Sequence, residues 1–212
     1  MTKHSTPAEE QISAAICSAI TSGRSCWSGI QSFGRDDLHY RALIALFHSA
    51  RSSGMSDEAI WGCASAVYEM MPCMLGHNGR SKSEKRETEI VDLQGARRFI
   101  NEQNIGEESR GFINGSWVGT SKFMYFFDPK IYFIWDSRVK LAIDIKLPLN
   151  EKLNINSGND YIKYCSSIIK CSQDEDIIRT IKKKFSGGEI NVRGGAEGRL
   201  IEAALYVTGG SS

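Results

Sequence analysis

Long apolar runs are missing from this chain of 212 residues. No window contains the roughly 18 consecutive apolar residues that a membrane-spanning helix needs. The first residues, MTKHSTPAEEQ, also lack the apolar core of a secretory signal. The sequence therefore predicts no membrane-spanning helix and no membrane partner, and we expect a cytoplasmic protein.

Metal-binding motifs are absent as well, although the chain contains six cysteines and four histidines. No two cysteines form a CxxC pair, which argues against a zinc ribbon and against a cysteine-bound iron–sulfur cluster. The cysteines are Cys17, Cys26, Cys63, Cys73, Cys165 and Cys171. We therefore predict no metal and no cofactor, and we expect reduced, mostly buried thiols.

The chain has almost no net charge, because 26 basic side chains balance 25 acidic ones. A balanced total does not identify a nucleic-acid-binding protein, since such a protein can still carry a basic face. Basic residues cluster locally within 80–86, at 97–98 and at 182–184. The sequence is therefore compatible with a polarised surface.

Strand signals are few, and helical spacing of apolar residues dominates. The first helical pattern has clear boundaries, because Pro7 precedes it and Gly23 follows it. Helices are expected near 8–22, 36–52, 56–71, 89–104, 121–127, 137–143, 161–171, 175–185 and 199–207. This pattern predicts an all-α fold.

We expect residues 1–212 to form one globular unit of two helical lobes. Residues 8–74 carry three helical patterns that predict one packed lobe. Residues 75–88 are polar and basic, so they form either a solvated loop or an arm that contacts phosphates. Residues 89–147 form the second lobe, and 157–212 hold the C-terminal helices.

The most informative segment is 115–139, GSWVGTSKFMYFFDPKIYFIWDSRV. Its first glycines, Gly115 and Gly119, flank a bulky pair and predict a tight turn, followed by a helix that ends before Pro129. Five apolar residues then lead to Asp136, at the start of another helical pattern. A carboxylate in this position either caps the helix or takes part in chemistry.

This segment resembles the helix-hairpin-helix DNA glycosylases, whose hairpin reads L-P-G-V-G-x-K-T-A and whose catalytic aspartate follows in a V-D-T-H-V-like segment. The matching residues are 115–119, GSWVG, and 135–139, WDSRV. The hairpin lacks the family's proline, Trp117 replaces a glycine, and Arg138 replaces the histidine after the aspartate. The resemblance implies a two-lobed, all-α fold with a cleft between the lobes.

The resemblance also implies that Asp136 is catalytic. Its carboxylate would stabilise positive charge on the sugar and orient the attacking water. Alignment of Val118-Gly119 with the family's V-G places Ser121 at the position of the catalytic lysine, one residue before Lys122. Lys122 is therefore a candidate Schiff-base nucleophile, a phosphate contact or a solvated helix lysine. With water as nucleophile, the enzyme would be monofunctional.

Contacts with DNA are expected at the hairpin, because backbone N–H groups at the start of a helix bind phosphate. The predicted DNA-binding residues are Gly115, Trp117, Gly119, Thr120, Ser121 and Arg138. An enzyme that acts on a base must extrude it and hold it against aromatic surfaces. Candidates for this base pocket are Trp27, Phe33 and Trp135.

Together these features predict a DNA glycosylase that hydrolyses the N-glycosidic bond of a modified or mismatched base in double-stranded DNA and leaves an abasic site. A monomeric, nucleoid-associated enzyme of this kind would serve base-excision repair or defence against foreign DNA with modified bases. The alternative is a non-catalytic DNA-binding protein that kept the hairpin. A helical scaffold protein is a third interpretation.

Overall fold

The computed structural model describes residues 7–22, 38–69, 91–102, 110–184 and 197–210. These residues form α1 (Glu9–Ser22), α2 (Leu38–Ser52), α3 (Asp57–Glu69), α4 (Leu93–Glu102), α5 (Trp117–Phe127), α6 (Ser137–Asp144), α7 (Gly158–Ser172), α8 (Glu175–Lys184) and α9 (Glu197–Gly209). Within these ranges the only β pairing consists of two isolated bridges. The predicted all-α class is therefore confirmed for the described residues.

A capping side chain fixes where the fourth helix begins. Asp92 accepts hydrogen bonds from the backbone N–H groups of Gln94 and Gly95, both at 3.1 Å. The preceding residue, Val91, forms an antiparallel bridge with Ile113. Among the described residues the fourth helix therefore begins at Leu93, because the bridge at Val91 and the cap at Asp92 keep these two residues outside the helix.

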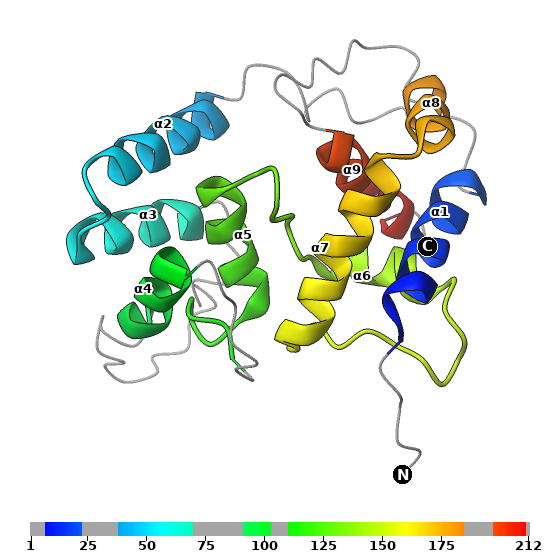
Figure 1. Ribbon diagram of the computed structural model, residues 1–212, viewed down its shortest axis with the longest axis horizontal. Helices are drawn as coiled ribbons and strands as arrows, with labels where there is room; N and C mark the ends of the chain where they lie inside the picture. Colours follow the sequence, from blue (N-terminus) through cyan, green and yellow to red (C-terminus); the bar gives the residue numbers. More distant parts are fainter. Residues whose placement is uncertain (1–6, 23–37, 70–90, 103–109, 185–196, 211–212) are drawn as a thin grey trace, which may run out of the picture.

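The helices pack in two groups (Figure 1). One group consists of α2, α3, α4 and α5, with α3 in contact with each of the other three. The second group consists of α1, α6, α7, α8 and α9. The first helix therefore packs against the C-terminal helices, whereas the sequence pattern predicts a single lobe over residues 8–74. Local periodicity identifies a helix but not its partner, which here comes from the other end of the chain.

Aromatic side chains fill the interior of the first group. Phe47 of α2 and Phe123 of α5 meet edge to face, with ring centroids 5.0 Å apart. Phe99 of α4 stacks on Phe112 at 5.7 Å. These rings are nearly inaccessible to solvent. Their burial ties α2, α4 and α5 into one packed body.

The turn before α5 is shorter than the sequence predicts. Asn114 and Gly115 adopt positive φ angles of 50° and 62°, and the N–H of Ser116 donates to the carbonyl of Ile113 at 2.8 Å. Trp117 is already helical. Gly119 therefore lies in the first turn of α5, against Ile113, and does not belong to the turn.

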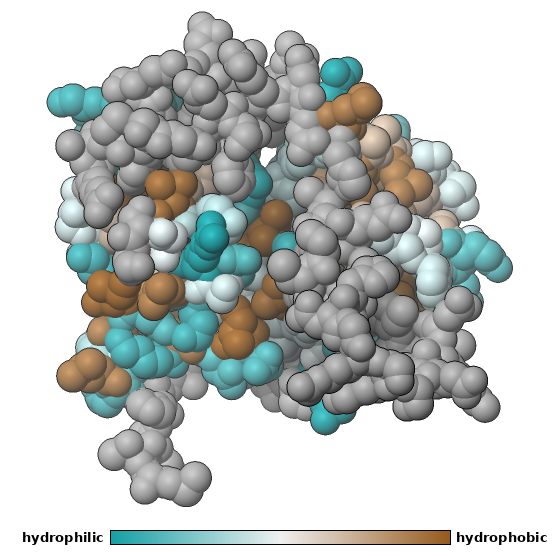
Figure 2. All heavy atoms as spheres, turned by 180° about the vertical axis from the view of Figure 1, so that it is seen from behind, coloured by the Kyte–Doolittle hydropathy of each residue, from teal (hydrophilic) through white to brown (hydrophobic). Residues whose placement is uncertain are grey.

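The surface of the described residues is mixed in polarity. Figure 2 shows apolar residues on the rear face as separate patches among hydrophilic ones. None of the described helices is long and apolar enough to cross a membrane.

A close approach between α5 and α7 joins the two groups. The ring of Trp117 packs beside Tyr161, with centroids 5.6 Å apart. Gly158, at the first position of α7, makes room for it, because a Cβ atom there would lie 2.5 Å from the indole Cζ2. This contact is the first of several that fix α5 relative to the second group.

We predict that Gly158→Ala lowers the free energy of unfolding by about 1–3 kcal/mol, because the added methyl group overpacks a fully formed interior. Urea denaturation with a spectroscopic readout would measure the change. Gly62→Ala is the matched control. Gly62 is exposed inside α3, and no atom lies within 4 Å of the position that a methyl group would take there. Alanine at this position should therefore raise helix stability by up to about 1 kcal/mol. Equal stability of wild type and Gly158→Ala would contradict the tight contact.

Candidate functional site

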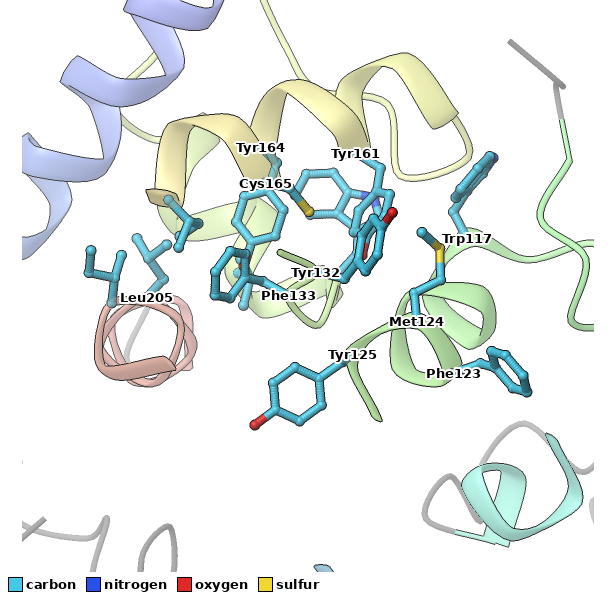
Figure 3. Close-up of a cluster of buried hydrophobic side chains, with 14 of the residues drawn as sticks. Trp117, Phe123, Met124, Tyr125, Tyr132, Phe133, Tyr161, Tyr164, Cys165 and Leu205 are labelled. Atoms are coloured by element: carbon cyan, nitrogen blue, oxygen red, sulfur yellow. The ribbon is translucent and has the colours of Figure 1, made fainter. Parts of the chain in front are cut away.

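The connection from α5 to α6, residues 128–136, passes from one helix group to the other (Figure 1). Tyr132 packs edge to face on Phe99 of the first group, with centroids 5.2 Å apart. Phe133 lies against Gly198 of α9 in the second group. Figure 3 shows both side chains inside the buried cluster. The connection is therefore anchored on both sides before it reaches Asp136.

Asp136 is the N-cap of α6. Its Oδ1 accepts a hydrogen bond of 2.8 Å from the backbone N–H of Arg138. Within the described ranges, no donor contacts the second oxygen, Oδ2. The side chain is half-buried. Among the described residues, capping thus uses one of the two carboxylate oxygens.

Lys122 of α5 lies close enough to Asp136 for the two charges to interact. Burial lowers the pKa of the Lys122 amine, and the negative charge of Asp136 opposes this shift. A desolvated amine loses its proton more easily than a surface lysine does. The structure therefore brings together, from two helices, the two residues that the sequence singles out as catalytic candidates.

A buried hydrogen bond fixes the spacing between these two residues. The backbone N–H of Trp135 donates to Ser121 Oγ at 2.9 Å, and Ser121 Oγ donates to the carbonyl of Val118 at 2.9 Å. Ser121 and Trp135 have no solvent-exposed surface. The bond joins the residue before Lys122 to the residue before Asp136, so it helps to position both candidate side chains.

Four of the predicted DNA-binding residues have internal roles. Trp117, Gly119, Thr120 and Ser121 are buried. Thr120 Oγ1 accepts a bond of 3.0 Å from the N–H of Ile113, inside the turn. All four residues lie within α5, with Trp117, Thr120 and Ser121 packed in the interior and Gly119 against Ile113.

Trp135, a predicted member of the base pocket, is a core residue. Its ring lies 4.8 Å from that of Tyr164, and its Nε1 donates to the carbonyl of Ile155 at 3.1 Å. With no exposed surface, this ring offers no face to an extruded base. The other two candidates, Trp27 and Phe33, lie outside the described residues.

Two predicted DNA-binding residues remain at the surface. Gly115 is exposed in the turn before α5. Arg138 is exposed at the first turn of α6, with its guanidinium 4.8 Å from the ring of Tyr206 and its Nη1 3.0 Å from the Tyr206 hydroxyl. Ser116, the N-cap of α5, makes no side-chain cap hydrogen bond. The start of α5 is therefore not closed by its own cap.

The last helix adds Glu202, for which the sequence predicted no role. Glu202 is buried and pairs with Arg199, one turn earlier on α9. Its Oε2 accepts a bond of 3.1 Å from the N–H of Ile134, and the hydroxyl of Tyr164 donates to the Ile134 carbonyl at 3.2 Å. Both backbone groups of the residue two positions before Asp136 are thus held. Only the spacing of Arg199 and Glu202 on one helix face gave a signal in the sequence.

Polar groups also meet where α9 approaches α5. The guanidinium of Arg199 lies 5.2 Å from the ring of Tyr125, and the hydroxyl of Tyr125 lies 2.6 Å from that of Tyr40 on α2. Burial raises the pKa of the Tyr125 phenol, so this group stays neutral. Figure 3 shows Tyr125 pointing away from the other labelled rings. The junction therefore combines hydrogen-bonding groups from three helices.

The chemistry that these residues offer is that of a carboxylate within electrostatic range of a partly buried amine. A carboxylate can stabilise an adjacent cationic centre, and such an amine can attack an electrophilic carbon. Among the residues that the structure describes, no group of three His, Cys, Asp or Glu side chains could hold a metal ion.

Comparisons with protein-family models, curated proteins and solved structures find no match. The functional interpretation therefore rests on the geometry around Asp136 and Lys122.

Proposed function

We propose that the protein is a DNA glycosylase that hydrolyses the N-glycosidic bond of a modified or mismatched base in double-stranded DNA and leaves an abasic site. The observation that carries the proposal is the state of Asp136, which is half-buried with one oxygen used for capping. A half-buried carboxylate that caps through one oxygen, within electrostatic range of a partly buried lysine, fits a reaction that builds positive charge on a sugar.

Cleavage of an N-glycosidic bond leaves positive charge on the sugar ring as the base departs. A carboxylate fixed next to the anomeric carbon stabilises that charge and can orient a water molecule for attack. Asp136 is suited to this role because its backbone and Oδ1 are held by the cap and by the anchored connection. In this mechanism it needs no movement to reach its working position.

In this proposal the two helix groups would be the two lobes of the enzyme, and the site would lie at their junction. The extruded base would enter at the junction of α5 and α9, where the half-buried Arg199 supplies hydrogen-bond donors. This guanidinium would take the place of the aromatic surface that the sequence assigns to Trp135. Hydrogen bonds from buried donors discriminate between bases more strongly than apolar contact does.

DNA would be gripped by its phosphates at two nearby points. The start of α5, whose N-cap Ser116 makes no side-chain bond, favours an anion through its backbone N–H groups and the helix dipole. Arg138 at the start of α6 supplies a positive charge on the surface beside Asp136. Both contacts read the backbone of DNA and not its sequence, and one monomer would provide both.

A second candidate function is strand cleavage by Lys122. The burial that lowers the pKa of Lys122 is the property that makes an amine a Schiff-base nucleophile. An attack by this amine on the anomeric carbon, in place of water, would displace the base and link the enzyme to the sugar, which opens to a Schiff base. Removal of a proton from C2′ would then expel the 3′-phosphate by β-elimination and nick the strand, and water would hydrolyse the Schiff base to release the enzyme.

We predict that Asp136→Asn lowers base release from its substrate duplex by about 100-fold or more. Asparagine caps helices as well as aspartate does, so the variant should fold with unchanged thermal stability. The assay is release of a free base from a panel of duplexes with oxidised, alkylated, deaminated or mismatched bases. Asp128→Asn is the matched control, because Asp128 lies in the same connection and accepts a bond from Lys130 N–H at 3.1 Å.

Two outcomes would count against catalysis by Asp136. If wild type and Asp136→Asn both leave every duplex intact but bind DNA equally well, the protein is a non-catalytic DNA-binding protein. If neither the wild type nor Asp136→Asn binds single- or double-stranded DNA at low salt, the protein is better explained as a helical scaffold.

We predict that borohydride traps a covalent complex between the wild-type protein and DNA that contains an abasic site, if Lys122 acts as nucleophile. Lys122→Gln should lose the complex, because it removes the desolvated amine beside Asp136. Lys130→Gln, which changes an exposed lysine of the connection, should keep it. Base release without any trapped complex would identify a monofunctional hydrolase and assign Lys122 a phosphate contact.

A further inference from the structure

Two cysteines from opposite ends of the chain meet in the interface between α1 and α7. The sulfur atoms of Cys17 and Cys171 lie 3.6 Å apart, although 154 positions separate the residues in sequence. The two helices that carry them are packed together over their length (Figure 1). Both cysteines are unbonded thiols in this structure.

The two thiols differ in their surroundings. Cys17 is partly exposed, whereas Cys171 is buried and its Sγ lies 3.6 Å from the carbonyl of Ser13. The hydrogen bond with Cys171 lowers the pKa of Cys17 to about 7, and the same bond raises the pKa of Cys171. Cys17 therefore loses its proton more readily than Cys171, is partly exposed, and has a thiol as its neighbour.

We propose that Cys17 and Cys171 are an oxidation site at which a hydroperoxide converts the two thiols into a disulfide that links α1 to α7. This proposal stands independently of the glycosylase function, because it rests on the helix interface behind the Asp136 site. The fold, and not a sequence motif, brings these two cysteines together.

The reaction has two balanced steps. The Cys17 thiolate attacks a peroxide oxygen, the O–O bond breaks, and Cys17 sulfenic acid and an alkoxide or hydroxide form. The Cys171 sulfur then attacks the sulfenic sulfur, forms the S–S bond and releases the oxygen as water after proton transfer. The peroxide gains two electrons, and the two thiols together lose two electrons.

Formation of the disulfide requires the sulfur atoms to approach from 3.6 Å to about 2.05 Å. The new bond would close a very long loop of chain and thus restrict the unfolded state. Because α1 also packs on α6 and α9, the link would brace the helices that carry Asp136 and Glu202.

The other described cysteines are poor targets for the same oxidant. Burial raises the pKa of Cys63 to about 11 and that of Cys165 to about 12. Both are therefore protonated and shielded at neutral pH, and thiols in that state react slowly. Selective oxidation at Cys17 follows from this contrast.

The test is peptide mapping of the full-length protein after treatment with hydrogen peroxide and blocking of free thiols with maleimide. Trypsin separates the cysteines, because cleavage after Lys3, Arg24, Lys170 and Arg179 yields peptides 4–24 and 171–179 with one cysteine each. We expect a cross-linked pair of these peptides that disappears on reduction. Oxidation should also raise the melting temperature by about 5–15 °C.

Cys17→Ser and Cys171→Ser should each remove the cross-link and the rise in melting temperature, whereas Cys63→Ser, the matched control, should keep both. The proposal is overturned if the wild-type peptides stay maleimide-labelled, if Cys17 proceeds to sulfinic acid without linking, or if either cysteine links to a different partner. The wild-type map decides the question even where a variant fails to fold.

Discussion

The hydrogen bond from the Trp135 N–H to Ser121 Oγ is the constraint on which the site depends. It lies in a region without solvent access, so the N–H would have no replacement partner if the hydroxyl were lost. An unsatisfied group of this kind costs about 1–3 kcal/mol. The chain therefore favours the one arrangement in which α5 and the connection to α6 meet at these two residues. Lys122 and Asp136 follow directly after them, so their proximity is a consequence of buried structure.

The remaining contacts of the connection act in the same direction. Glu202 and Tyr164 hold the two backbone groups of Ile134, and Tyr132 and Phe133 are buried on opposite helix groups. A buried carboxylate such as Glu202 is costly unless it is paired, and here Arg199 and a backbone N–H satisfy it. This polar network fixes the backbone of the connection between α5 and α6. Preorganisation of that kind is what a site that acts on developing charge requires.

Helices were the part of the fold that the sequence could predict, because apolar spacing, caps and prolines are local signals. The partner of α1 could not be predicted in this way, since its contacts with α7 involve residues more than 150 positions away. The roles of Trp117 and Trp135 were also hidden. An aromatic residue beside a glycine turn suits a DNA contact or a core position equally well. Tertiary contacts decide between these two roles. Trp117 packs in the space above Gly158, and Trp135 packs against the ring of Tyr164.

The position of the lysine illustrates how tertiary contacts change the meaning of a motif. Successive residues of an α-helix point about 100° apart, so Ser121 and Lys122 cannot face the same surroundings. Ser121 points into the interior, where its hydroxyl bonds the backbone, and a lysine there would bury a charge beside a bound N–H. Lys122 faces the junction instead, within range of the charge of Asp136. In this fold, the residue after the aligned position is the one that a catalytic or phosphate-binding amine would have to occupy.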